Sequence, residues 1–201
     1  MPRPRKPGSK CVRGRAIWQQ DPDGAELRVR LVSAAKEAPM HFQISALDPD
    51  QFAPLFELPN DALAARLAMR CTASAKPGFP CRVSLTDAEV GDELLLVNFV
   101  HQDTSSPYRA SHAIFVRKGA SQAHPAVDEV PEGFRSRTLS LRAFDKDGLL
   151  VSAELCEGSA TERTLAAQLA LARVAYVHLH YAKFGCYGAR ADRALRPGTL
   201  P

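Results

Sequence analysis

The chain has 201 residues, 45% of them hydrophobic and 24% charged, which is enough to bury the core of one ordinary domain. No apolar run is long enough to span a bilayer, and no apolar segment follows the charged N-terminus as in a secretory signal, so we expect a cytoplasmic protein with no membrane partner. The net charge of +4 comes from residues 1–39, which hold nine Lys or Arg against four Asp or Glu; residues 40–201 hold 17 against 18, so no nucleic acid is expected to bind the folded part.

Residues 1–39 are predicted to be a basic, disordered leader. They have a start rich in Pro and Arg, and one alternating run at 26–32 that is typical of a single strand. Lys36-Glu37 can be encoded as AAG-GAG, which reads as a ribosome-binding sequence at a suitable distance before Met40. Two alternatives stand: synthesis starts at Met40, or the leader is made as a disordered tail. We expect one domain over 40–193 and a frayed tail over 194–201.

The domain is predicted to be α+β, with a mainly antiparallel sheet of about seven strands and two or three helices, because strands and helices do not alternate regularly. Apolar runs and alternation predict strands at 41–44, 69–73, 81–85, 93–101, 113–117, 138–145, 149–155 and 174–182. Helical spacing predicts helices at 52–56, 60–69 and 161–172. Asp147-Gly148 is typical of a tight turn, which makes 138–155 the clearest hairpin.

The expected strand at 174–182 carries two histidines two residues apart, so His178 and His180 lie on one face. This pair suits a zinc or iron site completed by His101 or Cys186. Alternatively, the two histidines are hydrogen-bonded inside a half-buried sheet. We favour the second interpretation and assign no metal ligand.

Thiol chemistry is a separate possibility for this part of the chain. A nearby histidine lowers the pKa of a thiol and supplies a base, so His178, His180 and Cys186 are the candidate catalytic residues. Cys81 is a second candidate thiol, and core packing is the alternative role for both Cys81 and Cys186. The five cysteines are scattered, without a Cys-x-x-Cys pair, which predicts reduced thiols rather than a disulfide framework.

Arginines on or beside the expected strands predict an anion pocket, because a guanidinium group grips carboxylate or phosphate in a fixed plane. The candidate ligand-binding residues are Arg82, Arg142, Ser84, His101 and Arg109. In the alternative interpretation, Arg82 and Arg142 form structural ion pairs with Asp87 and Asp145. No phosphate loop, dinucleotide fingerprint, nucleophile elbow or His-Glu-x-x-His motif is present, so the cofactor stays unknown.

Five segments, in this order, carry a family resemblance. They are Pro77-Gly-Phe-Pro-Cys-Arg-Val-Ser-Leu-Thr-Asp-Ala88, Ser106-Pro-Tyr-Arg109, Ile114-Phe-Val116, Leu141-Arg-Ala-Phe-Asp145, and Val177-His-Leu-His180 with Gly185-Cys186. Over about 41–193 the chain resembles the bacterial family catalogued as domain of unknown function 1203. The resemblance implies a single-domain cytoplasmic protein and no mechanism. A small polar residue is expected after the second histidine, where this chain has Tyr181.

We predict that the protein binds a small anionic ligand in a cleft built from His, Arg and Cys side chains, with enzymatic turnover left open. A non-catalytic interaction or regulatory protein is the alternative, and a metal-dependent hydrolase is the third hypothesis. The oligomeric state is left open. The cleft requires that distant residues converge, namely Arg82, His101, Arg142, His178, His180 and Cys186.

Overall fold

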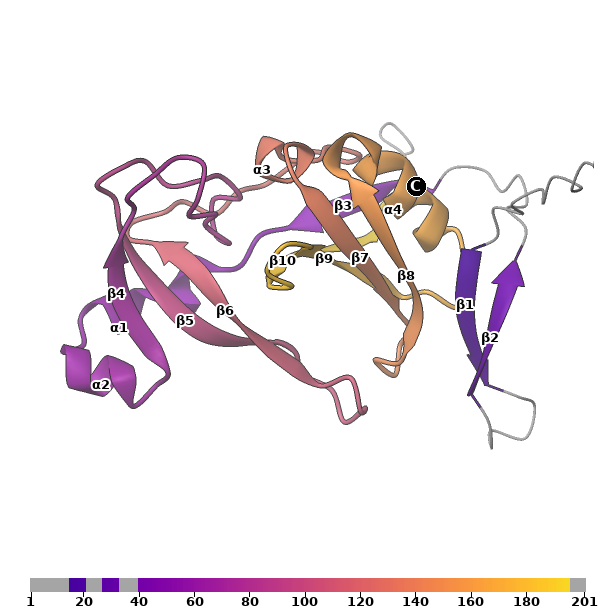
Figure 1. Ribbon diagram of the computed structural model, residues 1–201, viewed down its shortest axis with the longest axis horizontal. Helices are drawn as coiled ribbons and strands as arrows, with labels where there is room; N and C mark the ends of the chain where they lie inside the picture. The colour runs from indigo at the N-terminus through magenta and orange to yellow at the C-terminus, as the bar shows by residue number, and fades with distance from the viewer. Residues whose placement is uncertain (1–14, 21–26, 33–39, 196–201) are drawn as a thin grey trace, which may run out of the picture.

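Two antiparallel sheets form the fold of the computed structural model, which describes residues 15–20, 27–32 and 40–195. The large sheet has the strand order β2-β1-β8-β7-β9-β10-β3, and the small sheet has the order β4-β5-β6 (Figure 1). The strands are β1 Arg15–Gln20, β2 Leu27–Val32, β3 Phe42–Ser45, β4 Ala68–Thr72, β5 Glu93–Gln102, β6 Ala110–Arg117, β7 Thr138–Phe144, β8 Leu150–Glu157, β9 Tyr176–Tyr181 and β10 Tyr187–Arg193. The predicted α+β class with mainly antiparallel pairing is confirmed.

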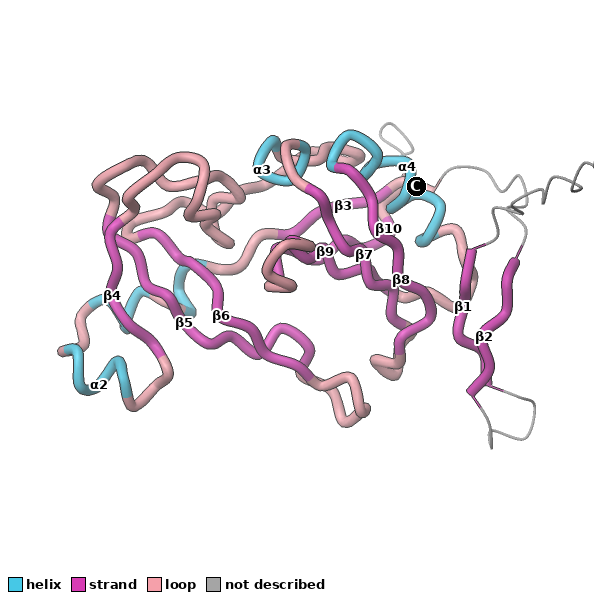
Figure 2. Tube along the Cα trace, in the orientation of Figure 1, coloured by secondary structure: helices cyan, strands magenta, loops and turns pink. Residues whose placement is uncertain are grey.

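The helices are short and lie outside the sheets (Figure 2). They are η1 Pro49–Gln51, α1 Ala53–Phe56, α2 Asn60–Ala64, α3 Glu132–Arg135, η2 Gly158–Ala160 and α4 Thr161–Leu169. The predicted helix at 60–69 ends early, because Leu67 has a positive φ of 53° and Ala68 already begins β4. In the part of the chain that is described, no helix is both long and apolar enough to cross a membrane.

The β7–β8 hairpin forms where the Asp-Gly pair predicts it. Gly148 has a φ of +75°, a conformation that glycine adopts without the steric penalty of a Cβ. One carboxylate oxygen of Asp145 accepts the N–H groups of Asp147 and Leu149, which closes the turn. The Gly148 carbonyl also accepts a hydrogen bond from the Ser106 hydroxyl at 2.9 Å. This end of the large sheet is therefore tied to the loop between β5 and β6.

The predicted strand at 81–85 is wrong, because this segment forms a compact turn. The N–H of Leu85 donates to the Cys81 carbonyl, and the N–H of Cys81 donates to the Thr86 carbonyl. A bridge between Pro80 and Asp87 closes the base of the turn. Apolar alternation predicted a strand, but the side chains from Cys81 through Val83 are all buried, since other segments cover the turn on both sides.

Strand β10 was missed by the sequence analysis. Its second half carries Arg190, Asp192 and Arg193, so it lacks an apolar run. It nevertheless pairs with β9 on one side and with β3 on the other. Its first residue, Tyr187, is 4% exposed and packs in the core of the small sheet with Phe52, Leu95 and Val97. One aromatic side chain of the large sheet therefore packs in the core of the small sheet.

Helices α3 and α4 cover one face of the large sheet. Phe134 of α3 and Leu165 of α4 are both fully buried, and they pack in one cluster with Leu141 of β7 and Leu179 of β9. Because side chains alternate along a strand, the neighbours of Leu141 on β7 and of Leu179 on β9 point to the opposite face. That opposite face of β7 and β9 carries Arg142 and His178, which are paired in register.

Part of the predicted leader is described as a hairpin of β1 and β2. Strand β2 lies at the run that predicts a strand, whereas β1 was not predicted. One registered pair, Ile17 with Ser152, joins β1 to β8. The remaining leader residues, 1–14, 21–26 and 33–39, lie outside the described residues, as does the tail from 196. The leader and the start at Met40 therefore stay predictions.

Candidate functional site

Four histidines from three strands lie together between the two sheets. His101 comes from β5, His112 from β6, and His178 and His180 from β9. The ring of His101 lies 4.8 Å from that of His112, 5.5 Å from that of His178 and 5.1 Å from that of His180, measured between centroids. His178 is 2% exposed and His180 is 0% exposed. The prediction that these two histidines share a face is confirmed.

The hydrogen bonds of the cluster leave several ring nitrogens without a partner. His180 Nδ1 lies 2.9 Å from the Gly185 carbonyl, so it carries the hydrogen, and Nε2 is left as the acceptor nitrogen. His101 Nε2 lies 2.7 Å from His112 Nδ1. Three buried nitrogens, His101 Nδ1, His178 Nδ1 and His180 Nε2, have no hydrogen-bond partner among the described residues. Buried polar atoms normally have partners, so this cluster requires an explanation.

Burial keeps these imidazoles neutral. It lowers the pKa of His101 to about 4, of His178 to about 3 and of His180 to about 2, because a buried imidazolium loses its hydration. Burial is also the main cause that lowers the pKa of His112, and the positive charges of Arg142 and Arg82 add to it. Neutral rings keep an unshared electron pair at pH 7, which leaves them able to bind a cation or to accept a hydrogen bond.

Arg142 of β7 lies beside these histidines and is half-buried. Its Nε makes a long contact of 3.4 Å with the Ser140 hydroxyl. No carboxylate among the described side chains lies within ion-pair distance of its guanidinium. Asp145, the predicted partner, instead pairs with Arg173 at 3.1 Å. The predicted structural ion pair is therefore not formed, and the charge of Arg142 stays uncompensated by the described residues.

A cleft of about 790 Å³ opens next to the histidines, between β5 and β6 on one side and the start of β7 with the β9–β10 turn on the other. Its polar lining residues are Arg82, His112, Arg137, Thr138, Lys183 and Cys186. No Asp or Glu belongs to this described lining. The lining is therefore basic, and it also includes the aromatic rings of Phe79, Phe115, Tyr181 and Phe184.

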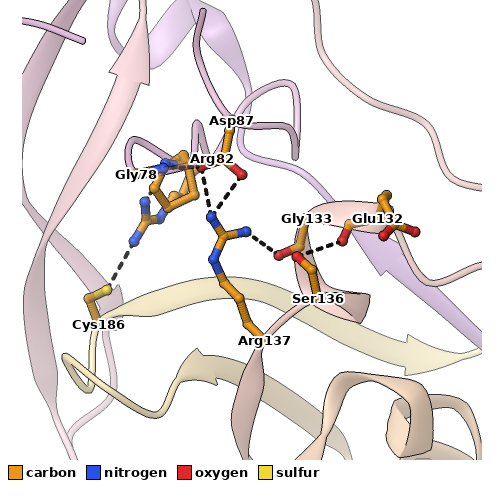
Figure 3. Close-up of polar contacts among 9 residues, drawn as sticks. Gly78, Arg82, Asp87, Glu132, Gly133, Ser136, Arg137 and Cys186 are labelled. Carbon is orange, nitrogen blue, oxygen red and sulfur yellow. Dashed lines mark hydrogen bonds and ion pairs between the residues drawn. The ribbon is translucent and has the colours of Figure 1, made fainter. Parts of the chain in front are cut away.

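Arg82 is held at the wall of the cleft by neutral groups. It is 1% exposed, its Nε donates to the Tyr187 carbonyl at 2.8 Å, and its Nη1 donates to the Pro80 carbonyl. Its Nη2 contacts the Cys186 sulfur at 3.1 Å (Figure 3). The guanidinium also lies over the Tyr181 ring, 5.1 Å from its centroid. Among the residues whose side chains are described, no carboxylate neutralises it.

Asp87, the predicted partner of Arg82, is bound by another arginine. Arg137 Nη2 lies 2.7 Å and 2.8 Å from its two carboxylate oxygens, and Arg137 Nη1 donates to the Gly133 carbonyl (Figure 3). Arg137 also lies over the Tyr181 ring, at 5.3 Å. Burial raises the pKa of Tyr181 to about 12, so its hydroxyl is neutral at pH 7. The Tyr181 ring thus contacts two guanidinium groups, of which Arg137 is paired with the Asp87 carboxylate and Arg82 has no carboxylate partner among the described residues.

The structure brings most of the predicted site residues together and leaves two outside. The histidine cluster contains His101, His178 and His180, with Arg142 beside them. Arg82 in the cleft wall contacts Cys186 and Tyr187, and Tyr187 stacks on His101. Of the three predicted catalytic residues, Cys186 lines the cleft, whereas His178 and His180 lie behind it. Ser84 contacts Thr86 in the 81–86 turn, and the exposed Arg109 pairs with Asp103 at 2.9 Å.

The sequence analysis missed several residues of the site, among them His112 and Arg137. His112 shares a face of β6 with Ile114 and Val116, because side chains alternate along a strand. This alternation was a usable signal for its inward position. Arg137 had no such signal, because it lies before β7, and its carboxylate partner is fifty residues away in sequence.

The family comparison agrees with the sequence resemblance. A family model described as "Protein of unknown function (DUF1203)" matches residues 78–193. The match contains the turn that holds Arg82, all four clustered histidines and Cys186. No curated protein and no solved structure matches the chain.

Proposed function

The chain belongs to the DUF1203 family, whose function is unknown, and we propose that it binds a small phosphate or carboxylate compound in the cleft between its two sheets. The observation that carries this proposal is the pair of guanidinium groups, Arg82 and Arg142, without a carboxylate partner among the described residues. A buried or half-buried cation is costly unless an anion compensates it. Both candidate carboxylates, Asp87 and Asp145, are bound by other arginines.

The position of His112 indicates where the anion would lie. His112 lines the cleft, contacts His101 behind it, and is close enough to both Arg142 and Arg82 that each lowers its pKa. An anion at the inner end of the cleft would therefore lie near two positive charges and one imidazole donor. The aromatic rings along the rest of the cleft suit an apolar part of the same ligand.

Binding of simple anions tests this proposal. Inorganic phosphate, pyrophosphate, succinate and citrate are titrated into the full chain by calorimetry, at two salt concentrations. We expect saturable binding of at least one probe, weakened by salt. Arg142→Gln should weaken it at least tenfold, since hydrogen bonds to charged groups are worth about 1.5–3 kcal/mol.

The matched control is Arg109→Gln, which removes a guanidinium that lies outside the cleft and pairs with Asp103. It should leave the affinity unchanged. The proposal is overturned if no probe binds saturably at millimolar concentration, or if Arg109→Gln and Arg142→Gln weaken binding equally. Circular dichroism of both variants shows whether each one is folded.

A further inference from the structure

We propose that His101, His178 and His180 form a binding site for one divalent transition-metal ion, with Zn²⁺ as the expected occupant. Each of the three rings offers one nitrogen, and these three nitrogens lie within 4.8 Å of one another. The three side chains come from two sheets, because His101 is on β5 and the other two are on β9. The site lies behind the cleft, and its proposal does not depend on anion binding.

The hydrogen bonds around the cluster prepare two of the rings as ligands. The Gly185 carbonyl holds the hydrogen of His180 on Nδ1, which turns the electron pair of Nε2 into the buried interior. His101 Nε2 lies 2.7 Å from His112 Nδ1, so a metal ion on His101 Nδ1 would place the hydrogen of this ring on Nε2, where His112 Nδ1 can accept it. Metal-binding histidines commonly have their second nitrogen fixed by a carbonyl or another acceptor in this way.

Each of the three rings has one buried nitrogen that no hydrogen bond occupies and that a metal could use. His101 Nδ1, His178 Nδ1 and His180 Nε2 have no partner among the described residues. A single cation at their centre would bind three electron pairs at once. The low pKa values given above keep the three rings neutral, so no proton competes with the metal near pH 7.

The donor set selects the kind of metal. Three imidazole nitrogens suit Zn²⁺ and its transition-metal neighbours, whereas Mg²⁺ and Ca²⁺ prefer oxygen ligands. No carboxylate or thiolate belongs to this described group of ligands, so the bound ion would keep its full charge of +2. Three protein ligands also leave a fourth position open, as in zinc sites that bind a water molecule or a small anion.

The position of His101 supports a built site. His101 lies at an irregularity of the β5–β6 ladder, where the register shifts between Val100 and Gln102. Such bulges redirect a side chain and are frequent beside functional sites. The ring of Tyr187 stacks on His101 with centroids 4.9 Å apart and fixes its plane. The ligand from the small sheet is therefore positioned by a residue of the large sheet.

The test uses the full chain without a histidine tag, stripped with a chelator and titrated with ZnCl₂ in competition with a chromogenic chelator. We expect one Zn²⁺ per chain at micromolar affinity or tighter, and a visible absorption band when Co²⁺ replaces Zn²⁺. His180→Ala and the milder His101→Asn should each weaken Zn²⁺ binding at least about 100-fold, because loss of an outer-shell partner alone typically costs 10–100-fold.

The exposed His124 supplies the matched control, and His124→Ala should bind Zn²⁺ like the wild type. Arg142→Gln should retain Zn²⁺ binding while it loses phosphate binding, which separates this proposal from the proposed function. The metal site is overturned if the stripped wild-type chain binds no Zn²⁺ at micromolar concentration. Unchanged Zn²⁺ binding by a folded variant with both His178→Ala and His180→Ala would overturn it equally.

Discussion

At the scale of single residues, the buried histidines make the stability of the metal-free protein depend on pH. The pKa values of about 3 for His178 and about 2 for His180 lie far below the usual 6.5. The unfolded chain therefore binds protons below pH 6.5 that the folded chain excludes. The neutral or cationic groups around the two histidines are His101, His112, Tyr176, Tyr187 and Arg142. Arg190 also lies nearby, and its charge is paired with that of Asp192.

We predict that the free energy of unfolding is highest above pH 6.5 and falls as the pH is lowered towards 5. Each neutral buried histidine contributes up to about 1.4 kcal/mol per pH unit in this window. Urea unfolding at pH 7, 6 and 5 in the presence of a chelator measures the slope. His180→Asn should make the slope shallower, whereas His124→Ala should leave it unchanged. A free energy of unfolding that stays constant between pH 7 and 5 would contradict this prediction.

Part of the site could be predicted from single residues. The spacing of His178 and His180 determines that they share a face, because strand geometry is local. The partners of Arg82 and Arg142 could not be predicted from nearby residues. Asp87 and Asp145 are the closest acidic candidates in sequence, yet Arg137 and Arg173 bind them after long-range packing. Ion-pair partners depend on which side chains the tertiary structure brings within reach.

At the scale of elements, the β9–β10 hairpin connects the cleft with the histidine cluster. Its turn places the Gly185 carbonyl against His180 and the Cys186 sulfur against Arg82. Directly after it, β10 pairs irregularly with β9 between Tyr187 and Ala189. Gly188 lies at this irregularity and is buried. The shape of the hairpin therefore depends on a residue without a side chain.

We predict that Gly188→Ala destabilises the protein by about 1–3 kcal/mol, the usual cost of overpacking a core. A Cβ atom at this position would lie 2.6 Å from a ring carbon of Phe134 and 3.0 Å from the Leu179 carbonyl oxygen. Phe134 cannot easily retreat, because it is fully buried and stacks on Tyr181 with centroids 5.4 Å apart. Urea unfolding measures the change.

The matched control for this substitution is Gly78→Ala. Gly78 is exposed, and the nearest atom to its added Cβ is the Ala75 carbonyl oxygen at an ordinary 3.4 Å. Its effect on stability should be within about 0.5 kcal/mol, as for most surface substitutions. Equal destabilisation by the two alanines would show that the contact with Phe134 is not the cause.

The elements differ in how far the sequence predicts them. Strands β7, β8 and β9 follow from local signals, namely an Asp-Gly turn and apolar alternation. The 81–85 segment alternates in the same way, but backbone hydrogen bonds and Asp87 close it into a turn. Strand β10 carries charged residues because its outward side chains are exposed, and its pairing depends on β9 and β3 rather than on its own composition.

At the scale of the whole molecule, residues 40–195 contain both sheets apart from the β1–β2 hairpin. The core side chains that are described belong to residues 40–191. The hairpin joins the large sheet through one registered pair, Ile17 with Ser152. A chain that begins at Met40 should therefore keep the fold, at the cost of exposing β8 as an edge strand.

We predict that removal of residues 1–39 shifts the Tm by no more than roughly 4 °C, the change expected for about 1 kcal/mol in a domain of this size. Differential scanning calorimetry of the full and shortened chains measures the shift. Zn²⁺ and phosphate binding should be retained, because every residue of both proposed sites lies after Met40. Loss of a cooperative transition in the shortened chain would show that the hairpin is required for folding.

The pairing of β3 with β10 has a consequence for the order of folding. Phe42 is registered with Arg193, and the N–H of Ala194 donates to the His41 carbonyl at 2.9 Å. During synthesis β3 leaves the ribosome early and finds its partner strand only when β10 has emerged, so the edge of the large sheet closes late and contact order is high. The same adjacency brings both ends of residues 40–195 together, which makes this domain suited to circular permutation, with a short linker across the old ends and a new opening in a surface loop.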